Sequence, residues 1–451
     1  MNDFANKGTP PSLQHAMDKA GGAANLLWKP DAPSWAVPVV KPEFTGWAAE
    51  QAAWGQGVAL SDLSHHMNDL FIKGPDALKL LSDYSANSYA NFEIGQAKQY
   101  IPVNANGDII TDGILMRDGA EAFTLSGVPS SQNWVRWHGE QNGYDVAFDA
   151  DPDSGFRGGR DPVLFRYQIQ GPRALDLVAA VFGGPLPQTK FFHSVPVTLA
   201  GRAFRALRHG MAGQAGYEFI GPWEHAGYVK DAFLKAGIAF DLIQVGGLAY
   251  STNGIESGWI PTPTPGIYSD PDLHAYRTSL KVFSFEGQKP LYGTFRSDNI
   301  EDYYVSPWEL GYGRSIKFDH DFYGRDALQA AETTVNRTRV TLELDKEQAL
   351  AEIGPEDAFF LSYGRYSIEI NGKIVGMTFY TGRIAPTDRV MALSLIDKAF
   401  AEPGTKVDFV WGSHPGLSAP ANAEHDYSRI SATVWPSPYS SFARTQYRQN
   451  G

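Results

Sequence analysis

The chain has 451 residues and a net charge of −12 at pH 7. This acidic balance disfavours a general nucleic-acid-binding role, which needs a basic surface. The lack of cysteine excludes disulfides, thiolate nucleophiles, iron–sulfur clusters and Cys-ligated zinc. The length predicts two or three domains. No signal peptide is recognised, and no run of about 18 apolar residues predicts a membrane helix, so we expect a soluble cytoplasmic protein.

His65 and His66 stand in LSHHMNDLFI, ahead of a run that alternates like a strand. Paired histidines raise the hypothesis of a metal site. Neighbours on a strand point to opposite faces, however, so the two side chains are poorly placed to bind one ion. We expect one histidine to be structural and the other to face a cavity, with no metal involved. The common phosphate-loop, dinucleotide-binding, nucleophilic-serine and zinc-protease motifs do not occur.

A strand–turn–helix pattern is repeated along the chain. The segments IKGPDALKLL and IQGPRALDLV share a Gly-Pro turn, and their glycines, Gly74 and Gly171, lie 97 residues apart. The following prolines suit the first position of a helix, where no backbone N–H is required. A looser copy, FYGRDALQAA, begins at Phe322. Such units between strand-rich stretches predict an α+β protein with duplicated elements.

The proline-rich segment WIPTPTPGIY, residues 259–268, predicts an ordered loop. After it, the last quarter of the chain has the pattern of strands and turns. TRVTLELD, from Thr338, alternates like a half-buried strand, and Asn371-Gly372 marks a tight hairpin. VMALSLI and KVDFVW predict further strands. We therefore expect a separate all-β domain that begins near residue 336.

Three long stretches resemble the glycine-cleavage T-protein (aminomethyltransferase) family: HGMAGQAGYEFIGP, AYSTNGIESGWIP and NIEDYYVSPWELGYGRSIKFDHDFYGRDAL. Within that family they are most similar to tetrahydrofolate-dependent O-demethylases of methoxy-aromatic acids, such as vanillate and syringate. The resemblance covers nearly the whole chain. It implies an α+β three-domain cloverleaf with a central folate channel. Residues 1–335 would form a folate-binding core of two interleaved α+β domains, and residues 336–451 a C-terminal β-barrel.

The resemblance also implies a set of folate-binding residues. Glu218 occupies the position of a glutamate that holds the pterin, and a carboxylate can accept two parallel hydrogen bonds from such a ring. From the sequence alone, a strand glutamate facing solvent is the ordinary alternative. Gln99, Gln168 and Trp259 stand in motifs that line the folate site of relatives. Asp112 matches an aspartate near the reactive nitrogens of the folate.

The residues implied at the substrate end separate this chain from its relatives. Tyr250 stands where aminomethyltransferases have an arginine and the O-demethylases a tyrosine, and His66 matches a histidine on the substrate side. In vanillate and syringate enzymes an arginine holds the aryl carboxylate, and Val128 stands there in this chain. Val37 likewise replaces a tyrosine. These departures argue against vanillate or syringate as the substrate, but not against the reaction class.

The resemblance therefore predicts transfer of a methyl group from a methoxy-aromatic compound to N5 of tetrahydrofolate. We expect Tyr250 and His66 to be catalytic, with a tyrosine and a product phenol having similar pKa values near ~10. Tetrahydrofolate is the expected methyl acceptor, and no nucleic-acid or membrane partner is expected. Two alternatives stay open: another folate-dependent one-carbon transferase (an aminomethyltransferase or a sulfonium demethylase), or a folate-binding protein without catalytic activity.

Overall fold

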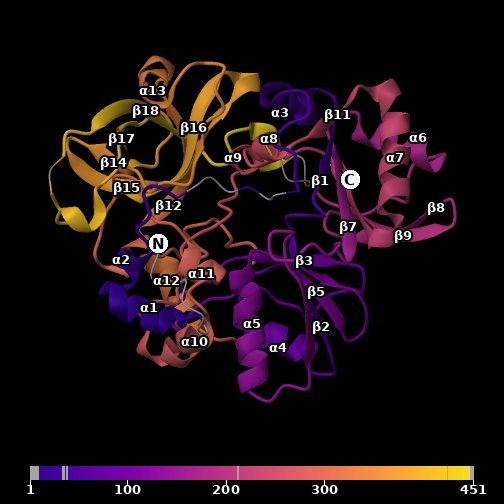
Figure 1. The fold of residues 1–451 in the computed structure, drawn as a ribbon, viewed down its shortest axis with the longest axis horizontal. Helices are drawn as coiled ribbons and strands as arrows, with labels where there is room; N and C mark the ends of the chain where they lie inside the picture. The colour runs from indigo at the N-terminus through magenta and orange to yellow at the C-terminus, as the bar shows by residue number, and fades with distance from the viewer. Residues whose placement is uncertain (1–9, 33–35, 37–38, 211–212, 424, 447–451) are drawn as a thin grey trace.

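The computed structural model describes residues 10–32, 36, 39–210, 213–423 and 425–446. Two open sheets and a barrel surround the centre of the molecule, and a helical lobe fills the remaining side (Figure 1). Mixed helices and sheets with a barrel near the C-terminus are the expected α+β architecture. Val37 lies outside the described residues.

The first sheet has five strands in the order β3-β4-β5-β2-β6, and its neighbouring strands are antiparallel. Its apolar face packs on α4 and α5 through a core that includes Leu70, Leu80 and Val135. The elements are β2 (Asn68–Lys73), α4 (Ala77–Asp83), β3 (Ala97–Tyr100), β4 (Gly113–Arg117), β5 (Ala122–Gly127), α5 (Pro129–Gln141) and β6 (Ala147–Asp151).

The second sheet has six strands in the order β11-β1-β7-β10-β9-β8, and α6 and α7 cover its outer face (Figure 1). The chain enters this sheet at β1, leaves it to build the five-stranded sheet, and returns at β7. The elements are α3 (Trp47–Gln56), β1 (Val58–Asp62), β7 (Leu164–Gln170), α6 (Ala174–Phe182), β8 (Ser194–Leu199), β9 (Arg202–Arg208), β10 (Gly216–Pro222), α7 (Ala226–Gly237) and β11 (Leu242–Val245).

The sequence of β7, LFRYQIQ, explains how this sheet is oriented. Phe165, Tyr167 and Ile169 belong to the apolar core shared with α6 and α7. Because successive strand residues point to opposite faces, Arg166 and Gln168 face the other way, towards the centre of the molecule. Both are nevertheless buried. Because the polar face of β7 is buried and not exposed to solvent, its side chains are expected to position functional groups.

The barrel is closed by six strands in the order β15-β14-β17-β18-β12-β16, with β16 pairing back onto β15. Short β13 is added along β15. Asn371 and Gly372 both have positive φ, 52° and 73°, and they join β14 to β15 as the sequence predicted. The elements are β12 (Arg337–Leu344), α13 (Lys346–Ile353), β13 (Leu361–Ser362), β14 (Ser367–Ile370), β15 (Lys373–Ile384), β16 (Arg389–Asp397), β17 (Lys406–Trp411) and β18 (Ser428–Pro436).

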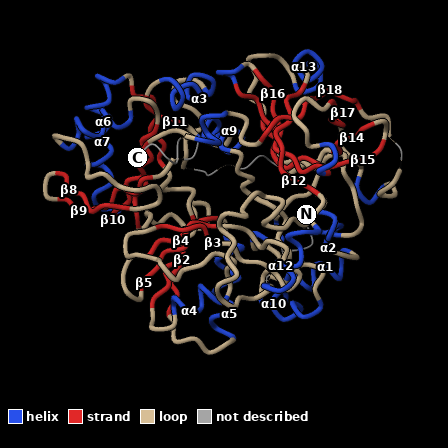
Figure 2. The backbone as a smooth tube through the Cα atoms, turned by 180° about the vertical axis from the view of Figure 1, so that it is seen from behind, coloured by secondary structure: helices blue, strands red, loops and turns tan. Residues whose placement is uncertain are grey.

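The helical lobe joins the N-terminal segment to the residues between the second sheet and the barrel, and loops make up much of it (Figure 2). The proline-rich segment 259–268 crosses this lobe as an ordered loop, as predicted. The remaining helices are α1 (Leu13–Ala20), α2 (Ala23–Leu27), α8 (Gly247–Tyr250), α9 (Asn253–Ser257), α10 (His274–Ser279), α11 (Phe285–Gln288), α12 (Arg325–Thr334) and α14 (Ser441–Thr445). No helix among the described residues is long and apolar enough to span a bilayer.

The predicted repeat is present in its first two copies. Gly74 and Gly171 have φ of 144° and 133°, and a Cβ on either would lie within 2.4 Å of a backbone oxygen. Each glycine therefore allows a neighbouring backbone segment, at Asp145 or at Gly57, to approach the chain closely before the helix begins. The prolines that follow precede the first helical residue by two positions, so the predicted helix start was early. The third copy has its helix, α12, but Phe322 does not follow a strand, so that part of the prediction was wrong.

Candidate functional site

One large cavity of about 2030 Å³ lies where the two sheets, the helical lobe and the barrel meet. All three sheets contribute to its wall: the five-stranded sheet through Gln99, the six-stranded sheet through Glu218, and the barrel through Tyr380. The structure gathers most of the predicted site residues in this one wall, namely His66, Gln99, Asp112, Val128, Glu218, Tyr250 and Trp259.

Glu218 belongs to a buried charge network that is centred on Arg166. Its Oε1 accepts a hydrogen bond from Nη1 of Arg166 at 2.9 Å, and Nη2 of Arg166 donates to Oδ1 of Asp69 at 2.8 Å. The Ser126 hydroxyl donates to Asp69 at 2.5 Å. Glu218 is only 6% exposed, so the alternative of a solvent-facing strand glutamate was wrong. Arg166 orients the glutamate and balances its charge where water cannot screen it.

Gln168 lies beside Glu218 rather than in the cavity wall. The two residues face each other across β7 and β10, in adjacent strands of the same sheet. Gln168 is 2% exposed, and its Nε2 has no hydrogen-bond partner among the residues that the structure describes. A buried amide without a partner is costly unless a ligand or a water molecule satisfies it.

A second polar group forms around Asp112. Nε2 of Gln99 donates to its Oδ2 at 2.7 Å, and the indole Nε1 of Trp259 donates to the same oxygen at 3.1 Å. Burial raises the pKa of Asp112, and the hydrogen bonds from Gln99 and Trp259 oppose that rise. Trp259 thus fixes the carboxylate through its edge, while its contact with a folate ring stays a prediction. Three of the predicted folate residues therefore form one hydrogen-bonded unit.

The two histidines lie in the turn between β1 and β2, not on a strand as expected. Their side chains still diverge. His65 forms a hydrogen bond between Nδ1 and the Ser154 hydroxyl at 3.0 Å, and its ring meets Trp223 edge-on. His66 turns into the cavity, with its ring centroid 4.6 Å from that of Tyr250. The structure thus places His66 in the cavity and His65 against Ser154 and Trp223, and the roles assigned to them stay predictions.

Burial sets the protonation states of the His66–Tyr250 pair. Desolvation lowers the pKa of His66 to about 4, so the imidazole is neutral at pH 7. Burial also raises the pKa of Tyr250, and the charge of Glu218 raises it further, while a hydrogen bond with Asn253 opposes both. The phenol therefore keeps its proton at neutral pH. A neutral imidazole beside a protonated phenol is an arrangement that can donate one proton and accept another.

Val128 forms the apolar end of the cavity wall. It is the N-cap residue of α5, and Pro129 after it occupies the first turn of that helix. Its side chain cannot pair with a carboxylate, so an anionic ligand must be held by other residues. Among the described residues, no group of three or more His, Asp or Glu side chains is placed to hold a metal ion. The absence of a metal from the reaction stays a prediction.

Sequence reasoning missed several residues of this wall. Arg166 and Asp69 were not predicted because they stand in the sequence context of ordinary strands. The signal that could have identified them was the alternation of polar residues in a buried strand. Tyr363 and Tyr380 also line the cavity and stack on each other with centroids 5.1 Å apart and planes 8° apart. They come from the barrel, more than a hundred positions after Tyr250, and no local pattern predicts that they meet the site.

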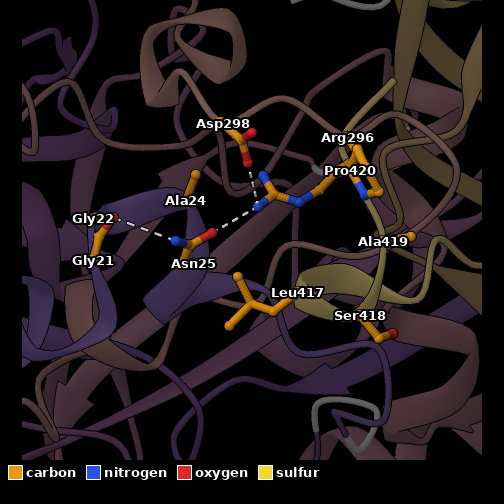
Figure 3. Close-up of a pocket in the computed structure, with 10 residues that line it drawn as sticks. All are labelled: Gly21, Gly22, Ala24, Asn25, Arg296, Asp298, Leu417, Ser418, Ala419 and Pro420. Atoms are coloured by element: carbon orange, nitrogen blue, oxygen red, sulfur yellow. Dashed lines mark hydrogen bonds and ion pairs between the residues drawn. The ribbon is translucent and has the colours of Figure 1, made fainter. Parts of the chain in front are cut away.

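A smaller hollow of about 500 Å³ lies between α2 and the loop before β18 (Figure 3). Arg296 points into it, 2.7 Å from Oδ1 of Asn25 and 2.7 Å from Oδ1 of Asp298. Its charge is matched by Asp298, and its guanidinium lies over the ring of Trp28. No predicted site residue lies there, so we assign this group to the stability of the fold.

Two open sheets and a barrel around one central cavity define the T-protein fold class. The chain superposes on the aminomethyltransferase T of the glycine cleavage system from Bartonella henselae with a TM-score of 0.63 at 18% identity. The match covers 94% of this chain and 96% of that chain. Residues 19–264 match the GCVT N-terminal domain family. The chain belongs to this family.

Individual relatives narrow the comparison. The chain is 35% identical to the syringate O-demethylase of a Sphingobium species (strain SYK-6), over 97% of both sequences. It is 27% identical to the sesamin methylene transferase of a Sinomonas species, over 83% of this chain and 86% of that protein. The aminomethyltransferase of Koribacter versatilis is 29% identical over 69% of this chain and 72% of that protein. The resemblance to O-demethylases within the T-protein family is confirmed.

Proposed function

We propose that this chain is a tetrahydrofolate-dependent O-demethylase, which moves the methyl group of a methoxy-aromatic compound to N5 of tetrahydrofolate. The products are a phenol and 5-methyltetrahydrofolate. The observation that carries the proposal is the buried Tyr250–His66 pair, which shares one cavity with Glu218 and Asp112. Similarity to a syringate O-demethylase along nearly the whole chain supports the same reaction class.

The cavity suits a reduced folate. Glu218 presents a buried carboxylate whose position is fixed by Arg166, as recognition of a ring with adjacent N–H donors requires. The buried amide of Gln168 beside it lacks a partner among the described residues, so the site offers a further polar contact. We propose that Glu218 and Gln168 hold the pterin, with Gln99, Asp112 and Trp259 near the reacting nitrogens. No metal takes part in this scheme.

Tyr250 and His66, in the same cavity, are proposed to act on the ether. Bound tetrahydrofolate supplies the amine that accepts the methyl group. Tyr250 donates its proton to the ether oxygen as the carbon–oxygen bond breaks, so that a phenol leaves rather than a phenolate, and Tyr250 regains a proton from the one that the methylated amine gives up. His66, as a neutral imidazole, holds the polar edge of the aromatic ring and orients it towards Tyr250. Val128 is proposed to contact the apolar part of the substrate.

Burial changes how the proton transfer is balanced. An ordinary tyrosine and a phenol both have pKa values near ~10, but burial raises the pKa of Tyr250 above that value. The product phenol forms in the same water-poor cavity, and desolvation raises its pKa in the same direction. The two groups therefore stay matched when both are buried. Alignment of the two reactants supplies much of the remaining acceleration, because such alignment can lower the activation barrier by roughly 7–11 kcal/mol.

Two related reactions are less well supported. An aminomethyltransferase of this family would have an arginine at the position of Tyr250. A sulfonium demethylase would have no use for a phenolic proton donor, because its thioether leaving group departs uncharged. The chain is an enzyme of the folate-dependent methyltransferase type, so a purely folate-binding role does not fit its relatives.

The proposal is tested by incubating the purified protein with tetrahydrofolate and a panel of methoxy-aromatic compounds. We expect equal amounts of a phenol and 5-methyltetrahydrofolate from at least one compound, resolved by chromatography. Glycine-derived aminomethyl donors and sulfonium compounds complete the panel. Turnover of one of these, with none of any aryl ether, would assign the chain to the alternative chemistry. The proposed location of the activity is the cytoplasm.

A further inference from the structure

Lys289 is a buried lysine in the wall of the central cavity. It follows α11 as its C-cap residue and is 5% exposed. Its Nζ donates a hydrogen bond to the backbone oxygen of Thr262, in the proline-rich loop, at 2.7 Å. No carboxylate of the described residues lies within ion-pair distance of it. An ammonium group has three N–H donors, so one carbonyl leaves it largely unsatisfied.

The surroundings of Lys289 add positive charge rather than neutralise it. Arg365 is 1% exposed and donates to the backbone oxygens of Tyr363 and Thr262, at 2.8 and 3.5 Å. It also has no acidic partner among the described residues. Burial lowers the pKa of Lys289 well below its usual value, and the charge of Arg365 lowers it further. A buried cation of this kind is stabilised when an anion enters beside it.

Contacts connect Lys289 to the reacting end of the cavity. Tyr363 and Tyr250 line the same cavity as Lys289. The backbone of Tyr363 in turn accepts from Arg365, which shares the Thr262 carbonyl with Lys289. Part of this cavity wall is aromatic, because Tyr363 lines it together with Tyr292. A flat ring fits against such a surface, with its ether towards Tyr250 and an acidic group towards Lys289.

We propose that Lys289 is the specificity-determining residue for a carboxylate on the methoxy-aromatic substrate. This inference rests on the proposed function, and it gives the cavity a cationic contact for an acid where Val128 offers only an apolar one. The relevant substrates are methoxy-aromatic carboxylates, held by a point charge at Lys289 rather than by a bidentate guanidinium at position 128. The glutamate tail of the folate is a second source of the same carboxylate chemistry, and the experiment separates the two.

The test compares wild type with Lys289→Gln, which keeps an N–H donor for Thr262 but removes the charge. The probes are anisate and its neutral counterpart anisamide. We expect the KM for anisate to rise about tenfold to hundredfold, as for loss of a charge-assisted hydrogen bond, with kcat changed less than about threefold. The KM for anisamide should be unchanged. Lys281→Gln, on an exposed lysine of the same segment, is the matched control and should behave like wild type.

Equal losses for anisate and anisamide would overturn the proposal, because they would show that Lys289 only supports the loop at Thr262. Lys289→Gln could instead raise the KM for tetrahydrofolate but not the KM for a tetrahydropterin that lacks the glutamate tail. That result would overturn the proposal, because Lys289 would then hold the tail of the folate. Calorimetric titration with anisate and anisamide gives an answer even without turnover. The wild type should bind anisate more tightly than anisamide, and Lys289→Gln should lose this preference. Lys289→Met takes the place of Lys289→Gln if that variant is unstable. Absence of demethylation with that preference intact would count against the proposed function alone.

Discussion

Replacement of Tyr250 by phenylalanine removes the proposed proton donor and little else. The ring remains, so its packing against His66, with centroids 4.6 Å apart, is preserved. The hydroxyl that is lost carries a proton at neutral pH, because burial raises the pKa of Tyr250. Both substrates should therefore still bind, while the leaving group must depart as a phenolate in a water-poor cavity.

The expected size of the effect follows from that change. General acid catalysis contributes about 10²–10⁴-fold to a rate, which corresponds to roughly 3–5 kcal/mol in the barrier. Tyr363 and Tyr380 also line the cavity, but they stack on each other in the part of the wall that the barrel forms. We expect a rate of methyl transfer lower by about 10²–10⁴-fold in Tyr250→Phe, with substrate constants changed less than about threefold.

The assay is a single-turnover measurement with enzyme in excess, which separates methyl transfer from product release. Tyr380→Phe is the matched control, since it removes the same hydroxyl from another buried tyrosine of the same cavity and should cost less than about tenfold. A Tyr250→Phe enzyme with a near-normal single-turnover rate would refute the proton-donor role and would leave alignment as the main source of acceleration.

Four further predictions concern binding, stability and pH. Glu218→Gln should weaken tetrahydrofolate binding about tenfold to hundredfold in calorimetry, and unchanged affinity would refute the pterin assignment. Arg166→Met should cost about 3–5 kcal/mol in urea unfolding, because two buried carboxylates lose their cation; a loss below about 1 kcal/mol would show that they are satisfied otherwise. Val128→Arg should shift kcat/KM towards small acids such as vanillate, and no gain would mean that position 128 does not reach the carboxylate. Between pH 6.5 and about 4, His66 is protonated in the unfolded chain but not in the folded protein. The free energy of unfolding should therefore fall as the pH falls through this range. His66→Gln should reduce this loss, which is measured by unfolding at each pH.

Much of the architecture was predictable because it depends on local chemistry. The turn at Asn371-Gly372 requires two positive φ angles, and the sequence provides residues that adopt them. Gly74 and Gly171 similarly mark places where a backbone oxygen leaves no space for a side chain. The barrel strands also follow the alternation visible in the sequence. The division of the chain at residues 335 and 336 into separate domains stays a prediction.

The failures share a physical cause, which is that tertiary contacts decide burial and direction. From the sequence, a glutamate in a strand is expected to face solvent. Glu218 is nevertheless buried, because β10 lies inside the sheet and Arg166 compensates its charge. His65 and His66 precede an alternating segment, but the chain turns there because β1 and β2 belong to different sheets. The roles assigned to Tyr250 and His66 came from family resemblance, since no local pattern brings a turn histidine and a helix tyrosine together.

The central claim is that the methyl carbon of an aryl ether is transferred intact to tetrahydrofolate. A substrate labelled with carbon-13 in its methoxy group tests this most directly, with products followed by NMR during a single turnover. The account predicts that the label appears as 5-methyltetrahydrofolate at the same rate as the phenol forms, and that no reaction occurs without tetrahydrofolate. Release of the label as formaldehyde or methanol, or phenol formation in the absence of tetrahydrofolate, would contradict it.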